Sequence, residues 1–155
     1  MLYTARQMKP PTIWESLKQR FFTADAGEIR IFSEIDYYRL QGLLTKQHLT
    51  AIAGFAVQLR QLRRLLDQGV LYPCKAVPSD LMTMNTTALL RSRRGTGFEV
   101  QLVYPREADR KARKVSVLSV LGLALIGKAE GDLVSDNMVI EKILFQPESR
   151  GNYYL

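Results

Sequence analysis

Side chains that could carry out catalysis are scarce in this sequence. It contains one histidine, His48, and one cysteine, Cys74, among 155 residues. A single cysteine cannot form an internal disulfide, and no Cys-x-x-Cys or Cys/His cluster is present, which excludes zinc fingers, iron–sulfur clusters and disulfide scaffolds. His48 has no acidic residue nearby in the sequence to orient it as a general base, so we interpret it as a polar turn residue and Cys74 as an inert thiol. We expect no catalytic residue, no bound metal and no cofactor.

Positive charge, in contrast, is concentrated in one part of the chain. The formal net charge is +7, and residues 89–114 hold eight basic side chains against three acidic ones. The densest part is a basic patch of five residues: Arg106, Arg110, Lys111, Arg113 and Lys114. Such a patch is either ordinary solvated surface or faces an acidic partner, whether phosphate or an acidic protein surface. Only Phe98 and Tyr104 accompany it, too few aromatic side chains to favour stacking on nucleic-acid bases.

The composition is typical of a soluble globular protein with one domain or two small ones. Hydrophobic residues make up 46% of the chain and charged residues 24%, which argues against disorder. No apolar run reaches the roughly 18 residues that suggest a membrane-spanning helix, and the N-terminus lacks the pattern of a secretory signal. We expect a cytoplasmic protein with no membrane partner.

The chain divides into three pieces, of which residues 1–30 form the first, an N-terminal extension. A capping-box pattern, Thr12-Ile-Trp-Glu15, predicts the start of a short helix. Trp14, Leu17 and Phe21 fall on one face of this helix. Because a helix of about ten residues is marginal alone, its aromatic face is expected to dock on the rest of the molecule or on a second copy. The expected oligomeric state is therefore a monomer or a weak homodimer.

Residues 31–73 are predicted to form a short helical hairpin. Ser33 is the expected N-cap of the first helix, and Gly69 is the expected end of the second. The lengths should be about 12 and about 19 residues, or near 18 Å and 28 Å. Apolar residues recur at the spacing of a coiled coil, namely Tyr37, Leu40 and Leu44, then Ile52, Phe55, Leu59, Leu62 and Leu66. The hairpin tip should lie within residues 45–51, which include Lys46, Gln47 and His48.

Residues 74–155 are predicted to form a small antiparallel sheet with one short helix, which makes the fold class α+β. The β-rich runs are 86–93, 98–104, 115–118 and 138–145, and the first two are joined by a turn containing Gly95 and Gly97. Ser119 is the expected N-cap of the helix, and Gly127 is its expected end.

Four sequence blocks, in order along residues 31–151, resemble the bacterial Gre transcription elongation factors and, among their relatives, the Gre-like regulators of nucleoside diphosphate kinase. The blocks are Ser33-Glu-Ile-Asp36, Asp80-Leu-Met-Thr-Met-Asn-Thr86, Leu102-Val-Tyr-Pro105 and Phe145-Gln-Pro-Glu148. The resemblance implies an FKBP-like C-terminal domain behind a coiled-coil hairpin. Family members dock that domain on RNA polymerase near its secondary channel and aim the hairpin into the channel.

Two departures from the family pattern are visible in the sequence. The family's Ser-Pro-Leu-Gly loop, part of the polymerase contact, corresponds here to Ser119, Val120, Leu121 and Gly122, without the proline. The stretch after Gly131-Asp132 lacks the family's next strand and its Pro-Gly-Gly turn, so the sheet is expected to be one strand or one hairpin smaller.

The resemblance also bears on enzymatic activity. Gre factors that cleave RNA carry paired acids at the hairpin tip, where carboxylates help to hold Mg²⁺ for phosphodiester hydrolysis. The expected tip of this chain has no acid, and Lys46 would repel a metal. We therefore expect a non-enzymatic transcription regulator that binds RNA polymerase and meets nucleic acid only indirectly. The alternative is a basic module that binds RNA or DNA through residues 106–114.

Overall fold

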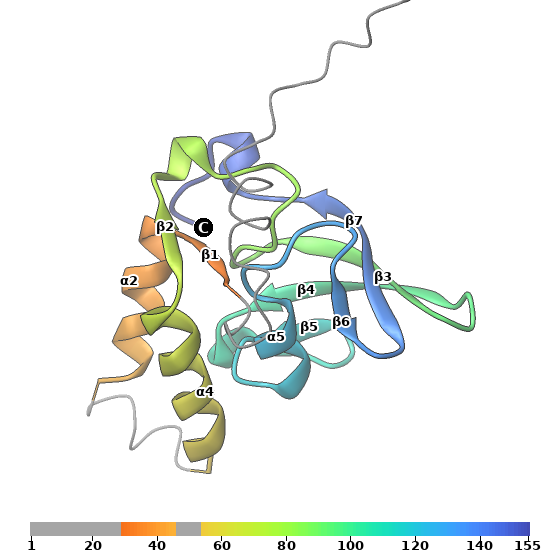
Figure 1. Cartoon of the computed structure of the whole chain (residues 1–155), viewed down its shortest axis with the longest axis horizontal. Coiled ribbons are helices and arrows are strands. Elements are labelled where there is room, and N and C mark those ends of the chain that lie inside the picture. Colours follow the sequence, from red (N-terminus) through yellow and green to blue (C-terminus); the bar gives the residue numbers. More distant parts are fainter. Residues whose placement is uncertain (1–28, 46–53) are drawn as a thin grey trace, which may run out of the picture.

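The computed structural model describes residues 29–45 and 54–155 (Figure 1). The predicted N-terminal helix and its aromatic face lie outside the described residues. So does the predicted hairpin tip of Lys46, Gln47 and His48. None of the helices in the described part is long and apolar enough to cross a membrane.

Two helices stand near the start of the described chain. α2 (Glu34–Leu43) begins directly after Ser33, whose Oγ accepts a hydrogen bond from the Asp36 amide at 3.2 Å. The predicted N-cap is thus confirmed. α4 (Ala56–Asp67) has 12 residues, fewer than expected, because Gly54 adopts φ 105° and the helix starts only after Phe55. Phe55 is 40% exposed, so its predicted place on the buried face of the helix is wrong.

A pair of short strands joins the ends of this helical unit. β1 (Ile31–Ser33) and β2 (Val70–Tyr72) pair in parallel, and neither was expected from the sequence. Gly69 leads into β2 where the chain passes close to Phe32, since a Cβ atom on Gly69 would lie 2.6 Å from the Phe32 ring. The predicted end of the helix at Gly69 is confirmed, since α4 ends at Asp67 with Gln68 as its C-cap, and Gly69 also allows this close packing.

The second sheet has five strands in the order β5-β4-β3-β7-β6. Their bounds are β3 Thr87–Ser92, β4 Gly97–Val103, β5 Lys114–Ser116, β6 Leu133–Ser135 and β7 Met138–Phe145. The predicted hairpin of β3 and β4 and the predicted last strand, β7, are confirmed. Figure 1 shows the sheet curling around α5 (Val120–Leu125), with the β3–β4 hairpin extending away from the helices.

Two details of this sheet correct the sequence-based expectation. β5 runs parallel to β4, so the sheet is mixed and not wholly antiparallel. Residues 104–113 carry the chain back so that Lys114 pairs with Gln101 of β4. β6 pairs with β7 across a turn at Asp136 and Asn137. The expected loss of a strand after Asp132 is therefore wrong, although the strand that is present has only three residues.

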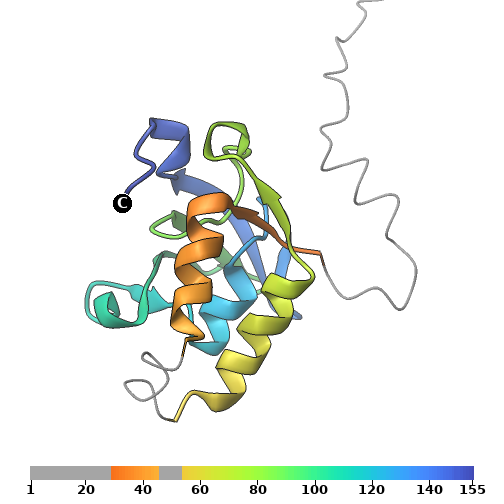
Figure 2. The ribbon, with the colours of Figure 1, turned by 90° about the vertical axis from the view of Figure 1, so that its left-hand side faces the viewer.

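Both helices of the hairpin share one apolar core with the sheet. Figure 2 shows α2 and α4 side by side with α5 behind them. Leu40 of α2 and Leu59, Leu62 and Leu66 of α4 belong to the same buried cluster as Leu90, Leu102 and Ile140 of the sheet. A self-contained two-helix coiled coil is not confirmed, because the seam residues also pack on the sheet and α5. The FKBP-like architecture stays a prediction.

Arg30, next to the start of β1, forms hydrogen bonds with the end of α5. Its side chain is 6% exposed, and Nη1 donates to the carbonyl oxygens of Leu123 (3.3 Å), Ala124 (3.3 Å) and Ile126 (2.7 Å). Carbonyl groups at a helix C-terminus lack intrahelical partners and carry partial negative charge, which a cation stabilises. Gly127 follows with φ 74°, as expected for the residue after a helix.

Candidate functional site

The loop of residues 119–122 is an exposed, rigidly held corner of the molecule. Ser119 is the N-cap of α5, and its Oγ accepts a hydrogen bond from the Gly122 amide at 2.9 Å. The same hydroxyl donates to the Ser116 carbonyl at 2.6 Å. Val120, the first residue of the helix, is 78% exposed. The loop thus presents one aliphatic side chain to solvent from a base tied to β5.

Gly122 allows this loop to lie against β5. A Cβ atom there would be 2.0 Å from the Ser116 carbonyl oxygen and 2.8 Å from Val117 Cα. Both are backbone atoms, which cannot turn aside as a flexible side chain can. The glycine predicted from the family loop therefore has a packing role in this chain.

The basic patch occupies the connection between β4 and β5. The side chains of Arg106, Arg110, Lys111 and Arg113 are exposed, and that of Lys114 is half-buried. Asp109 shapes the turn, because its Oδ1 accepts hydrogen bonds from the amides of Lys111 (2.8 Å) and Ala112 (3.3 Å). Within the described part of the chain, the only ion pair joins Arg91 to Glu141 at 2.7 Å. The five cations of the patch therefore have no carboxylate partner among the described residues.

One open groove of about 730 Å³ brings the loop and part of the basic patch together. Five of its lining side chains are apolar, namely Phe98, Val100, Ala108, Val115 and Leu121. The loop adds Ser119, and the patch adds Arg110, Arg113 and Lys114. Two candidate sites that the sequence suggests separately are thus neighbouring parts of one surface, which we call the β5 groove. Of the remaining patch residues, Arg106 lines a different groove.

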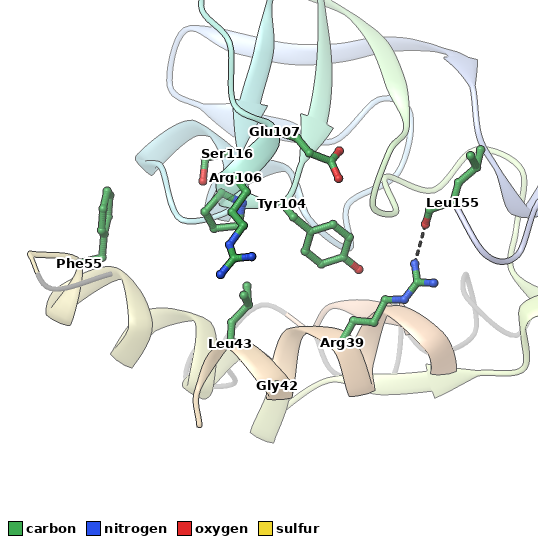
Figure 3. A pocket seen from close by; sticks show the side chains of 10 residues that line it. Arg39, Gly42, Leu43, Phe55, Tyr104, Arg106, Glu107, Ser116 and Leu155 are labelled. Atoms are coloured by element: carbon green, nitrogen blue, oxygen red, sulfur yellow. Dashed lines mark hydrogen bonds between the residues drawn. The ribbon is translucent and has the colours of Figure 1, made fainter. Parts of the chain in front are cut away.

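That second groove, of about 680 Å³, lies between α2 and the chain just after β4 (Figure 3). Leu43, Phe55 and Tyr104 supply apolar surface, and Arg106, which comes from the same side as Tyr104, points toward Leu43. Arg39 lies at one end, where its Nη1 donates to the Leu155 carbonyl at 2.5 Å. This groove could not be predicted from the sequence, because it joins residues that are far apart along the chain.

The four blocks that carry the family resemblance meet in the interior. Asp36 Oδ2 accepts a hydrogen bond from the Met84 amide at 2.8 Å, and Tyr104 donates its hydroxyl to Asp36 Oδ1 at 3.4 Å. Thr83 donates to Glu148 Oε2 at 2.7 Å. Gln146 Nε2 donates to the carbonyl groups of Pro78 (2.7 Å) and Leu81 (2.9 Å). These blocks therefore hold the helical unit to the sheet.

Burial controls the titration of this network. Asp36 is 5% exposed, and the loss of hydration raises the pKa of its carboxyl group to about 6. The Met84 amide, which stabilises the carboxylate, opposes this rise in pKa, and the nearby charge of Glu148 adds to it. Burial, and then the Asp36 charge, raise the pKa of Tyr104, so the phenol stays protonated and able to donate.

No metal-binding cluster is found within residues 29–45 and 54–155. In this part of the chain no three His, Cys, Asp or Glu side chains gather in a way that could hold a metal ion. Cys74 lies half-buried in a short 3-10 turn between the helical unit and the sheet. The expected tip residues Lys46, Gln47 and His48 fall outside the described chain, so their role stays a prediction.

Comparison with known proteins identifies the sheet and its loop. Residues 77–140 match the family model described as transcription elongation factor, GreA/GreB, C-terminal. Over this segment the chain is similar to the Gre factors. The matched segment contains β3 to β6, the 119–122 loop and the whole basic patch.

Other relatives extend the likeness beyond that segment. The regulator of nucleoside diphosphate kinase from Escherichia coli K12 is 28% identical over 134 residues, which cover 81% of this chain and 96% of that protein. The protein of the same name from Shigella flexneri has the same identity and coverage. The solved GreA/GreB elongation factor from Nitrosomonas europaea has a TM-score of 0.63 and 27% identity, and the match covers 75% of this chain and 99% of that one.

Proposed function

We propose that this Gre-like protein binds bacterial RNA polymerase near its secondary channel and regulates transcription elongation without cleaving RNA. The strongest support is the 119–122 loop, which lies inside the segment matched by the family model and resembles in sequence the family's polymerase-contacting loop. Its Val120 side chain is 78% exposed on a rigid base. Exposed aliphatic groups on rigid elements are suitable anchors for a protein partner. A polymerase partner also implies that the protein acts in the cytoplasm.

The valine that replaces the family's proline is compatible with this proposal. Val120 is the first residue of α5, a position where proline is common because the amide there has no intrahelical acceptor. The loop conformation is held instead by the Ser119 cap and by the close contact of Gly122 with Ser116. The loop therefore keeps its shape without the proline.

A pull-down with bacterial core RNA polymerase tests the proposal. We expect the wild-type chain to be retained at low salt and to be released by a Gre factor competing for the same site. Val120→Glu should weaken retention, since the fold tolerates an acid at an exposed helix N-terminus while an anchor is lost. Leu133→Glu is the matched control, because Leu133 is 56% exposed on β6, at the opposite edge of the sheet. If core polymerase fails to retain the wild-type chain, the proposal is wrong.

A stalled elongation complex should release no short 3′ RNA fragment when this protein is added. Cleavage would require carboxylates near the polymerase Mg²⁺, and the expected tip supplies Lys46, Gln47 and His48. Changing Gln47 and Thr50 to glutamate should not create cleavage either, because α2 has 10 residues and so spans only about 15 Å. Gel analysis of labelled transcripts gives the result, with a cleaving Gre factor as the positive control. Cleavage by the acidic double variant alone would show that the hairpin does reach the metal.

The basic patch supports one alternative, direct binding to RNA or DNA. Its five cations have no carboxylate partner in the described chain. Direct binding predicts an affinity that falls steeply with salt, by a log–log slope of about −0.7 to −0.9 for each phosphate contacted. Titration of labelled RNA and duplex DNA at several salt concentrations measures this slope. A lack of binding to either nucleic acid would eliminate the alternative.

A further inference from the structure

The groove drawn in Figure 3, which we call the α2 groove, presents apolar surface between α2 and the chain just after β4. We infer that the N-terminal extension of the same chain occupies this groove, with Trp14, Leu17 and Phe21 of residues 12–22 packed against its apolar side chains. The sequence leaves open whether this aromatic face docks on the rest of the molecule or on a second copy, and the groove favours the first. The inference concerns a contact within one chain, so it does not depend on the proposed function.

The α2 groove has the size and the lining that an amphipathic segment requires. Its volume of about 680 Å³ is within the range of about 300–1,000 Å³ that is typical of ligand pockets. Four lining side chains supply partly exposed apolar surface, namely Leu43, Phe55, Tyr104 and Pro105. An amphipathic helix binds such a groove through side chains at positions i, i+3 and i+7, which is the spacing of Trp14, Leu17 and Phe21.

The chemistry of the groove matches the aromatic side chains of the extension. Two of the apolar lining residues, Phe55 and Tyr104, are aromatic, and aromatic rings pack favourably on one another in offset or edge-to-face pairs. The Arg106 side chain is exposed and points toward Leu43 across the groove. A guanidinium group is attracted to the face of an aromatic ring, most strongly to an indole ring. Trp14 is therefore a well-suited occupant of the space beside Arg106.

The charges of the α2 groove favour a segment of low net charge. Arg39 already donates hydrogen bonds to the carbonyl groups of Leu155 (2.5 Å) and Tyr154 (3.4 Å). The other two charged lining residues, Arg106 and Glu107, have opposite signs. Residues 12–22 contain one acid and two bases, so they bring little net charge to this surface.

The chain between the segment and β1 is long enough to reach the groove. Arg30 is hydrogen-bonded to the end of α5, whereas Ser119, at the start of α5, donates its hydroxyl to the Ser116 carbonyl at 2.6 Å. Ser116 lines the α2 groove. α5 has six residues and spans about 9 Å, while residues 23–29 can extend over about 23 Å. The difference leaves length for a path around the outside of the helices.

Fluorescence of Trp14, the only tryptophan of the chain, tests the inference. In wild type we expect an emission maximum at shorter wavelength than in urea, and protection from quenching by acrylamide. Phe55→Asp removes an aromatic side chain from the groove at the N-cap of α4, where aspartate is favourable. Emission should then move to the wavelength of the unfolded chain. Trypsin should cleave after Lys18 and Arg20 at least about tenfold faster, because cleavage follows the population of the undocked form.

A second variant and a matched control make the test specific. Gly42→Gln fills the groove from α2, where a Cβ atom meets no atom within 4 Å and glutamine is a better helix former than glycine; it should change Trp14 as Phe55→Asp does. The control is Val57→Asp. Val57 is 54% exposed in the first turn of α4, outside the lining of the α2 groove, and an acid is also favourable there. Its rate of cleavage should stay within about twofold of wild type.

Each outcome decides for or against the inference. Circular dichroism during urea unfolding checks that the variants fold, and one folded groove variant is sufficient. The inference is overturned if acrylamide quenches Trp14 of wild type as strongly as in urea, or if the groove variants leave a protected Trp14 unchanged. Protection that is lost on dilution, with light scattering showing the mass of two chains, would assign the segment to a second copy and would also overturn it. Retention by core polymerase decides the proposed function in a separate experiment.

Discussion

Replacing Gly122 by alanine will lower the free energy of unfolding by about 3 kcal/mol or more. The added Cβ would lie 2.0 Å from the Ser116 carbonyl oxygen and 2.8 Å from Val117 Cα. Relief requires the backbone of α5 or of β5 to move, and these elements carry the 119–122 loop and one wall of the β5 groove. Urea denaturation followed by circular dichroism measures the loss of stability.

Gly42→Ala is the matched control for this substitution. Gly42 is inside α2, and a Cβ atom there would meet no atom within 4 Å. Because alanine has a higher helix propensity than glycine, this variant should gain up to about 1 kcal/mol. Equal stability of the two variants would show that the contact of Gly122 with β5 is not a constraint on the fold.

Removing the charge of Asp36 will abolish a large pH dependence of stability. Burial raises the pKa of this carboxyl group from 3.8 to about 6, so the folded chain binds the proton more tightly than the unfolded chain. The contribution of Asp36 therefore makes the protein more stable as pH falls from about 7 to about 4, and this gain is lost as pH rises through about 6. A shift of about two pKa units corresponds to about 3 kcal/mol.

The comparison of wild type with Asp36→Asn isolates this effect. The asparagine oxygen can still accept the Met84 amide but does not titrate, so the stability of wild type relative to the variant should fall by about 3 kcal/mol between pH 4 and pH 8. Thermal unfolding across this range gives the curve. Glu34→Gln, at an exposed acid in the same helical turn, should change stability by less than about 1 kcal/mol. A stability difference between wild type and Asp36→Asn that is constant with pH would contradict the raised pKa of Asp36.

Elements with strong local signals could be predicted from the sequence. Ser33 and Ser119 are N-caps as expected, since capping depends on residues within one turn. The last strand has the predicted bounds, Met138–Phe145, because a β-rich run ends at a proline. The apolar spacing predicts a helix that starts before Phe55. This start is wrong, because the backbone of Gly54 is not helical and α4 begins only at Ala56.

Features that depend on distant pairing could not be predicted. β1, β2 and β6 have three residues each, too few to show a period, and their existence depends on partners elsewhere in the chain. β5 lies at the predicted run 115–118, but its parallel pairing with β4 could not be predicted. In the sequence, Asp36 has the features of an ordinary acid in the first turn of a helix. Only the fold shows that it is buried and hydrogen-bonded to Met84 and Tyr104. The loop and the basic patch were both predicted from the sequence, but only the fold shows that they line the same groove.

The contact of Arg30 with α5 shows that the folded unit begins well before the segment that the family model matches. The family model starts at residue 77, yet a guanidinium from residue 30 satisfies three carbonyl groups at the end of the helix that follows the 119–122 loop. A fragment cut at residue 77 would leave those carbonyl groups without this donor and would uncover the apolar surface under α4. A chimaera that grafts the helical unit of a Gre factor onto this sheet would therefore need to supply an arginine at the same place.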